Sequence, residues 1–143
     1  MKIRKATKKD FKEIFSMIKE EYLKHYKEKW TEKNSLKTLN YYGMIGKIFV
    51  IEIGGEVAGF VILREEYYNN RKSVMVEELV VRGDIQRKGI GRKLMNFVEE
   101  YCKNNKVKYI WLITGKKVDA FKFYKELGYK YGEDTAYFSK ELR

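Results

Sequence analysis

Apolar residues near the start of the chain recur at the three- and four-residue spacing of a helix. The series begins after Asp10 and predicts one helix, whose inward-facing residues are Phe11, Ile14, Phe15, Ile18, Tyr22 and Tyr26. A weaker helical pattern follows Thr31, whose hydroxyl can cap its first turn. Two helices are therefore expected before the first long extended segment.

Extended patterns surround these helices. Residues 2–5 form a short one, and residues 47–53 and 56–64 form two longer ones that a pair of glycines joins as a tight hairpin. In residues 73–81 both alternating faces are apolar. A strand of that kind lies inside a sheet that is covered on both sides.

The rest of the chain alternates helices and strands. A helical stripe starts at Ile90, residues 107–113 indicate another buried strand, and residues 118–127 indicate a short helix that a glycine ends. Residues 129–131 and 136–140 are expected to close the chain as a hairpin. The order β-α-α-β-β-β-α-β-α-β-β predicts an α/β fold with a mixed, mostly antiparallel central sheet flanked by helices.

Length and composition favour one soluble domain. A chain of 143 residues has the usual size of a single domain, so residues 1–143 are expected to form one. No apolar run approaches the ~18 residues of a membrane span, and the amino terminus lacks the apolar centre of a signal peptide. The lone cysteine, Cys102, falls in a helical pattern typical of a buried thiol. We therefore expect a cytoplasmic protein.

The charge balance concerns the partners of the chain rather than its fold. A formal net charge of +11 raises encounter rates with anions such as nucleic acid, acidic protein or a phosphorylated cofactor. The alternative is that lysine merely covers the solvated faces. The many aromatic residues fall mostly at periodic positions, which favours a core role over base stacking.

The segment between the strand at 73–81 and the following helix can bind an anion. It holds Gly89 and Gly91 among basic side chains. A glycine-containing turn exposes backbone N–H groups, and a helix start adds unpaired donors and partial positive charge, which suits a phosphate or pyrophosphate. The alternative is a simple tight turn. The three glycines of a dinucleotide fingerprint and the lysine-serine ending of a P-loop are both absent.

Three segments together resemble the GNAT superfamily of N-acetyltransferases. Residues 86–91, Gln-Arg-Lys-Gly-Ile-Gly, match its Gln/Arg-x-x-Gly-x-Gly/Ala signature. Residues 77–81, Glu-Glu-Leu-Val-Val, are similar to the strand before that signature. Residues 120–129, Ala-Phe-Lys-Phe-Tyr-Lys-Glu-Leu-Gly-Tyr, are similar to its later Ala-x-x-Phe-Tyr-x-x-x-Gly-Phe/Tyr segment.

The resemblance implies acetyl-CoA as co-substrate and direct attack by a primary amine in a ternary complex. It also implies that the strand at 73–81 splays from the strand at 107–113, so that exposed backbone pairs with the pantetheine arm while the loop holds the pyrophosphate. The implied cofactor-binding residues are Leu79, Val80, Val81, Gln86, Arg87, Lys88, Gly89, Ile90, Gly91 and Arg92. Two positions depart from the family pattern: Gly83 stands where proline is common, and Lys117 stands where an asparagine often contacts the cofactor. Whether Lys117 contacts CoA stays open.

Acetyl transfer to an amine needs a base and an acid. An alkylammonium has a pKa near ~10.4, so the acceptor must lose a proton before it attacks. Glu77 and Glu78 are the candidates for that base, directly or through water, and Glu77 is preferred because it matches an acidic position in several family branches. Because side chains alternate along a strand, Glu77 and Glu78 are expected on opposite faces of the sheet. The alternative to a catalytic role is that each forms a salt bridge with a lysine. A strand N–H near Leu79 or Val80 is expected to polarise the thioester.

Tyr124 occupies the family position of the acid that protonates the leaving thiolate. The alternative to this catalytic role is that Tyr124 is a core aromatic residue in phase with Phe121 and Leu127. The only histidine, His25, is expected on a solvated helix face, and no residue spacing suggests a metal site.

The acceptor pocket is expected from residues 22–44 together with residues 67–71. The sequence does not identify the acceptor amine. It also leaves the oligomeric state undecided, with a homodimer open. The competing functions are a CoA-binding protein without catalysis and a basic nucleic-acid-binding module, for which no motif is present.

Overall fold

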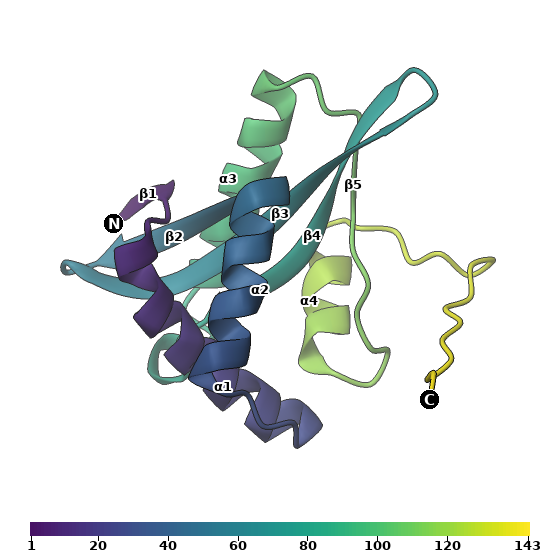
Figure 1. The fold of residues 1–143 in the computed structure, drawn as a ribbon. Coiled ribbons are helices and arrows are strands. Elements are labelled where there is room, and N and C mark those ends of the chain that lie inside the picture. The colour runs from purple at the N-terminus through teal and green to yellow at the C-terminus, as the bar shows by residue number, and fades with distance from the viewer. The chain divides into compact units, whose positions relative to one another are not determined.

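A five-stranded sheet organises the larger of two compact units in the computed structural model, which describes residues 1–143 (Figure 1). The units are residues 1–113 and 114–143. The strands of the first unit are β1 (Lys2–Lys5), β2 (Lys47–Ile53), β3 (Glu56–Tyr68), β4 (Arg71–Val81) and β5 (Tyr109–Trp111). Its α-helices are α1 (Phe11–Tyr26), α2 (Glu32–Ile45) and α3 (Ile90–Asn104), and two 3-10 turns are η1 (Lys8–Asp10) and η2 (Gly83–Ile85).

The strands lie in the order β1-β2-β3-β4-β5. Every neighbouring pair is antiparallel except β4 and β5, which run parallel. This arrangement confirms the predicted mixed, mostly antiparallel sheet flanked by helices. The hairpin of β3 and β4 is longer than predicted, because both strands continue to the turn at Asn69 and Asn70.

The two faces of the sheet are covered by different helices. One hydrophobic cluster joins α1 and α2 to alternate residues of the strands, among them Phe60, Ile62 and Val80. On the other face, the ring of Phe49 packs against Phe97 of α3, with the two ring centroids 4.9 Å apart. Figure 1 shows α1 and α2 in front of the sheet and α3 behind it. The predicted helices and caps are confirmed here, including the cap at Thr31, whose hydroxyl oxygen accepts the N–H of Asn34 at 3.1 Å.

The strand expected at 107–113 is shorter and more exposed than predicted. Only Tyr109–Trp111 pair with β4, and β5 lies at the edge of the sheet. The prediction of a buried strand was wrong because an edge strand has a neighbour on one side only. Its alternate side chains, Tyr109 and Trp111, are therefore exposed.

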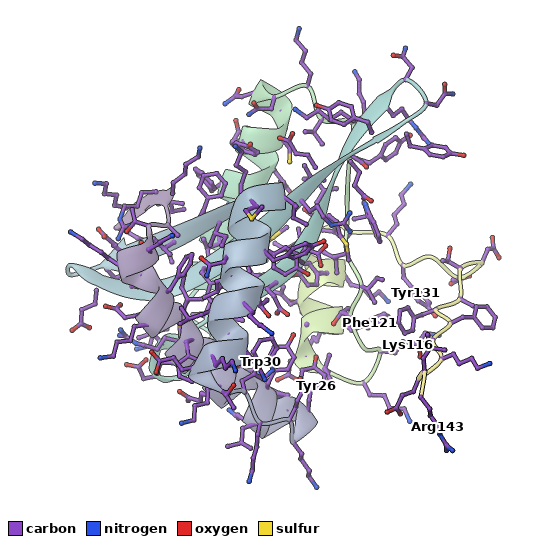
Figure 2. The ribbon with its side chains drawn as sticks, viewed as in Figure 1. Tyr26, Trp30, Lys116, Phe121, Tyr131 and Arg143 are labelled. Atoms are coloured by element: carbon purple, nitrogen blue, oxygen red, sulfur yellow. The ribbon has the colours of Figure 1, made fainter.

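The second unit contains α4 (Asp119–Glu126), which ends before Gly128 at a φ of +91°. Figure 2 shows Lys116, Phe121 and Tyr131 gathered in this unit, where the Tyr131 ring lies 5.3 Å from the ring of Phe121 and 4.9 Å from the Lys116 ammonium. The predicted closing hairpin is wrong, since residues 129–143 form no strand. The turn between residues 132 and 135 is present, but a two-stranded hairpin is at best marginally stable in water without a third strand or a packed face.

No helix of the structure is both long and apolar enough to cross a bilayer.

Candidate active site

The segment between β4 and α3 is held in place by its own polar side chains. The Gln86 amide donates to the carbonyl of Val81 at 2.8 Å, and Arg82 bonds Asp84 at 2.6 Å. Gly83 opens η2, where a Cβ atom would lie 2.7 Å from the Glu20 carboxylate of α1. These contacts turn the chain sharply from the end of β4 into the start of α3.

The loop presents unpaired backbone donors at the start of α3. The first N–H groups of a helix have no partner within it, and they carry the positive end of its dipole. Arg87 and Gly89 both have a positive φ, of 62° and 81°, which turns the backbone just before Ile90. Nothing lies within 4 Å of the place where a Cβ of Gly89 would stand. The loop predicted to bind pyrophosphate therefore has open space beside its amides, as an anion site requires.

The edge of β4 next to this loop is open. Pairing with β5 ends at Met75, so the following residues of β4 have no β5 partner. The Arg82 N–H bonds the carbonyl of Ala58 in β3 at 2.9 Å. Because hydrogen-bonded and non-hydrogen-bonded pairs alternate in an antiparallel ladder, Val80 also faces β3, whereas Leu79 and Val81 face the open edge. Of the two N–H groups expected near the thioester, that of Leu79 is the one directed to the opening.

A β-bulge in β4 brings both carboxylates to one side of the sheet. Leu63 of β3 pairs with Val76 and Ile62 pairs with Glu78, so Glu77 is an extra residue. Glu78 accepts a hydrogen bond from Tyr22 of α1, and Glu77 accepts one from Tyr42 of α2. Both tyrosines pack against the same hydrophobic cluster. The expectation that Glu77 and Glu78 lie on opposite faces was therefore wrong, because the bulge interrupts the alternation on which it rested.

Glu77 is paired with a cation. Arg64 Nε donates to Glu77 Oε1 at 2.6 Å, and the Tyr42 hydroxyl donates to Oε2 at 3.1 Å. Arg64 also reaches Glu66 at 3.0 Å. Both oxygens of Glu77 thus already have donors. The desolvation of Tyr42 and the nearby Glu77 carboxylate raise the pKa of the Tyr42 hydroxyl to about 12, so it stays a donor.

Glu78 has no cationic partner and is largely removed from water. The pKa of the Glu78 carboxyl is raised to about 7: desolvation raises it most, the hydrogen bond from Tyr22 lowers it, and the nearby carboxylates of Glu77, Glu21 and Glu28 raise it. Desolvation and the same carboxylate push the pKa of the Tyr22 hydroxyl far above its ordinary value, so Tyr22 also acts as a donor only. Glu78 can therefore change protonation near neutral pH.

Aromatic residues from α1 and the connection to α2 lie next to this carboxylate. The Tyr22 ring lies 5.2 Å from the rings of both Tyr26 and Trp30, and Figure 2 shows Tyr26 and Trp30 close together at the end of α1. The buried Nε1 of Trp30 has no hydrogen-bond partner. Residues 22–44 thus place Tyr22 and Tyr42 beside the carboxylates, whereas Tyr67 and Tyr68 lie at the distant end of the hairpin. The acceptor pocket itself stays a prediction.

Sequence reasoning did not identify Arg64 as a site residue, and it included Tyr22 only as the first residue of the expected acceptor region, 22–44. Arg64 lies 13 residues from its partner Glu77, and their meeting depends on the bulge, which has no local sequence signal. Tyr22 gave a weak signal, since it carries a hydroxyl in an otherwise apolar helical stripe. His25 is not in the site and pairs with Glu21 at 3.3 Å.

Tyr124 and Lys117 belong to the second unit. Tyr124 is a buried residue of α4, and its ring lies 5.0 Å from that of Phe123 and 5.7 Å from that of Tyr129. Lys117 is exposed just before α4. The structure of the first unit thus brings together the loop, the open strand edge and the carboxylates. The roles of Tyr124 and Lys117 stay predictions.

Comparisons with known proteins extend along most of the chain. Residues 10–129 match the Acetyltransferase (GNAT) family model. An uncharacterized N-acetyltransferase from Archaeoglobus fulgidus is 32% identical over 122 residues, which cover 78% of this chain and 82% of that protein. An uncharacterized N-acetyltransferase from Methanocaldococcus jannaschii is 30% identical over 139 residues, which cover 90% of this chain but only 60% of that longer protein.

Solved structures with a similar fold also include an acetyltransferase. A crystal structure of a possible acetyltransferase from Clostridium difficile 630 superposes with a TM-score of 0.88 and 17% identity, covering 99% of this chain and 98% of the other. At that identity the likeness concerns the fold alone. The family match, which spans both units, and the relatives at 30% identity or more lead to the conclusion that this chain belongs to the GNAT family and is an acetyltransferase.

Proposed function

We propose that this acetyltransferase transfers the acetyl group of acetyl-CoA to a primary amine, and that Glu78 accepts the proton that the amine must lose. The observation that carries the proposal is the pair of carboxylates at the β4 bulge, beside the open part of that strand. One of the two is neutralised by Arg64, and the other is half-buried, largely desolvated and without a cation.

The residues of the first unit suit acetyl-CoA, which supplies the activated acetyl group. The amides at the start of α3 would hold its pyrophosphate, with the basic side chains of Arg87, Lys88 and Arg92 nearby. The outward-facing backbone of Leu79 and Val81 would pair with the amides of the pantetheine arm, as a strand pairs with an added strand. The Leu79 N–H would polarise the thioester carbonyl.

Glu78 suits the role of general base better than Glu77. A base must have a free oxygen, and Arg64 and Tyr42 occupy both oxygens of Glu77. Tyr22 bonds Oε1 of Glu78, which leaves Oε2 for the acceptor amine or for a water molecule that bridges to it. A pKa of about 7 makes Glu78 a stronger base than an ordinary carboxylate and keeps much of it ionised at neutral pH. The preference for Glu77 on sequence alone therefore gives way to Glu78 in this proposal.

Tyr124 is proposed as the acid that protonates the departing thiolate. Its support is the resemblance of residues 120–129 to the family segment. The expectations that residues 1–143 form a single domain and that the protein is cytoplasmic also stay predictions.

The proposed function is tested by release of CoA thiol from acetyl-CoA. The purified chain is assayed with peptides, polyamines, aminoglycosides and amino acids, and each acetylated product is identified by its mass. Glu78→Gln should lower the rate by roughly 10²–10⁴-fold near pH 7. Glu77→Gln serves as the matched variant at the adjacent position and should lower it less. No thiol release with any amine would contradict acetyl transfer to amines, and full activity of Glu78→Gln would remove Glu78 as the base.

A further inference from the structure

A hollow lined by aromatic side chains lies near the far end of the β3–β4 hairpin. Its volume is about 330 Å³, and we call it the arm hollow; its lining residues are Tyr68, Arg71, Ser73, Tyr109 and Trp111. Three of them are large and accessible, with exposed fractions of 73% for Tyr68, 56% for Tyr109 and 38% for Trp111. Figure 1 shows this hairpin reaching beyond the end of α2. Clustered exposed aromatic residues are typical of binding surfaces.

The one charged residue that lines the arm hollow is a cation, Arg71. The Arg71 guanidinium lies 5.0 Å from the centre of the Tyr109 ring, which holds it in place by a cation–π contact. None of the five lining residues is acidic. A held guanidinium beside aromatic rings favours a carboxylate-bearing side chain as its occupant.

The arm hollow lies on the same face of the sheet as the two carboxylates. Tyr68 pairs with Arg71, and Ser73 pairs with Tyr109, so these side chains share a face with those of Met75 and Arg64. A chain of hydrogen bonds continues along that face. Arg64 bonds Glu77 at 2.6 Å and Glu66 at 3.0 Å, and Glu66 accepts the Trp111 indole N–H at 2.8 Å.

The distance between Glu78 and the arm hollow indicates how long an acceptor must be to reach both. Glu78 pairs with Ile62 of β3, whereas the arm hollow begins at Ser73, opposite Glu66, and ends at Tyr68; four to six residues of β3, roughly 13–20 Å, therefore separate Glu78 from it. A single amino acid or a short diamine does not span that length. An extended peptide spans it with about five residues.

We propose that the acceptor is a polypeptide, which places its amine at Glu78 and an acidic side chain, about five residues away, in the arm hollow. This inference rests on the proposed function and adds the substrate class. A nucleic acid suits the same aromatic and basic residues less well, because its phosphates would continue along the whole path to Glu78, which no cation neutralises, whereas the peptide needs its one negative charge only beside Arg71. The net charge of +11 also favours encounter with acidic peptides.

The experiment compares acceptors that differ in length and charge. The acceptors are an eight-residue peptide with a free amino terminus and glutamate at position six, the same peptide with lysine there, and the dipeptide of its first two residues. We expect a KM for the glutamate peptide about tenfold below that of the dipeptide and below that of the lysine peptide. Equal KM values for all three, or acetylation of a polyamine but of neither long peptide, would overturn the proposal while leaving amine acetylation in place.

Two neighbouring tyrosines give a matched pair of variants. Tyr67 and Tyr68 are 75% and 73% exposed, and alternation puts them on opposite faces of β3, with only Tyr68 in the arm hollow. Tyr68→Ala should raise the KM for the glutamate peptide about tenfold with little change in kcat, and should leave the dipeptide unaffected. Tyr67→Ala should change neither.

Equal effects of the two variants would overturn the proposal. It would also be overturned if a single-stranded oligonucleotide bound to the chain and lost affinity on Tyr68→Ala while the peptide KM did not change. Absence of transfer to every acceptor, the dipeptide and polyamine included, would overturn the proposed function as well.

Discussion

Glu77 and Glu78 are neighbours in the sequence and yet meet different surroundings. Arg64 and Tyr42 bond both oxygens of Glu77, whereas Glu78 is half-buried against Tyr22 without a cation. The same residue type is therefore a paired anion at one position and a titrating group at the next. The difference arises from desolvation and neighbouring charge.

The desolvation of Glu78 should make the stability of the fold depend on pH. Because the pKa of Glu78 is raised on folding, its contribution is fully present below the ordinary carboxyl value of 4.5 and is lost as the pH rises through about 7. Glu78→Gln removes this dependence. The free energy of unfolding of Glu78→Gln, relative to the unsubstituted chain, should therefore increase by about 1–3 kcal/mol between pH 5 and pH 8.

Urea unfolding at the two pH values measures this change. Glu77→Gln is the control, and it should not show the same increase because Arg64 stabilises the Glu77 charge in the folded chain. If the difference for Glu78→Gln were constant from pH 5 to pH 8, Glu78 would not be a desolvated carboxyl.

At the scale of the residue, the sequence identified the two carboxylates but not their surroundings. A pair of acidic residues in an apolar strand is visible in the sequence. Which of them meets a cation depends on Arg64, which comes from another strand. Local pattern therefore supplied the candidates, and long-range pairing separates them.

At the scale of the element, the site depends on β4, on its bulge and on the turn into α3. The loop was predictable because its glycine spacing matches a family signature and its position follows a buried strand. The bulge was not predictable, since the apolar pattern of residues 73–81 indicates a regular strand. The bulge is nevertheless what puts both carboxylates on one face.

Gly89 should be sensitive to substitution for a reason that goes beyond its backbone conformation. A glutamate there would put a negative side chain into the open space beside the first amides of α3. Gly89→Glu should weaken CoA binding at least ~10-fold, or about 1.4 kcal/mol, as measured by calorimetry.

Gly55 provides a control for backbone strain. Its φ is also 81°, and nothing lies within 4 Å of its Cβ position, but it belongs to the β2–β3 turn. Gly55→Glu should cost similar stability, since side chains disfavour this φ, and should leave CoA affinity unchanged. Equal CoA affinities for the two variants, with both folded, would remove the loop at 87–92 from the cofactor site.

At the scale of the whole molecule, the proposed chemistry draws on both units. The base and the loop belong to residues 1–113, and the proposed acid, Tyr124, belongs to residues 114–143. Tyr124→Phe keeps the ring and deletes only the hydroxyl. It should lower turnover on the order of 10²-fold while CoA affinity and melting temperature stay nearly unchanged.

Tyr129→Phe is the matched control, because its ring contacts that of Tyr124 in the same unit. It should leave turnover nearly unchanged. Normal turnover of Tyr124→Phe together with a lower melting temperature would instead make Tyr124 a core residue.

The overall architecture was largely predictable from the sequence, but the structure of the carboxyl-terminal segment, residues 129–143, was not. Long periodic segments such as α1 and α3 carry their own pattern. The pattern at residues 136–140 is short and lacks a partner, so it did not determine a strand. The length of β5 likewise depends on its neighbour and not on its own apolar residues.

The pH dependence of kcat/KM tests the central claim, that Glu78 is the base, most directly. A base works only when it is ionised, so kcat/KM should rise with pH through a step near 7, followed by a further rise as the acceptor amine loses its proton. In Glu78→Gln the step near 7 should disappear, while the rise at high pH remains. A profile of Glu78→Gln that keeps the step near 7 would contradict the account.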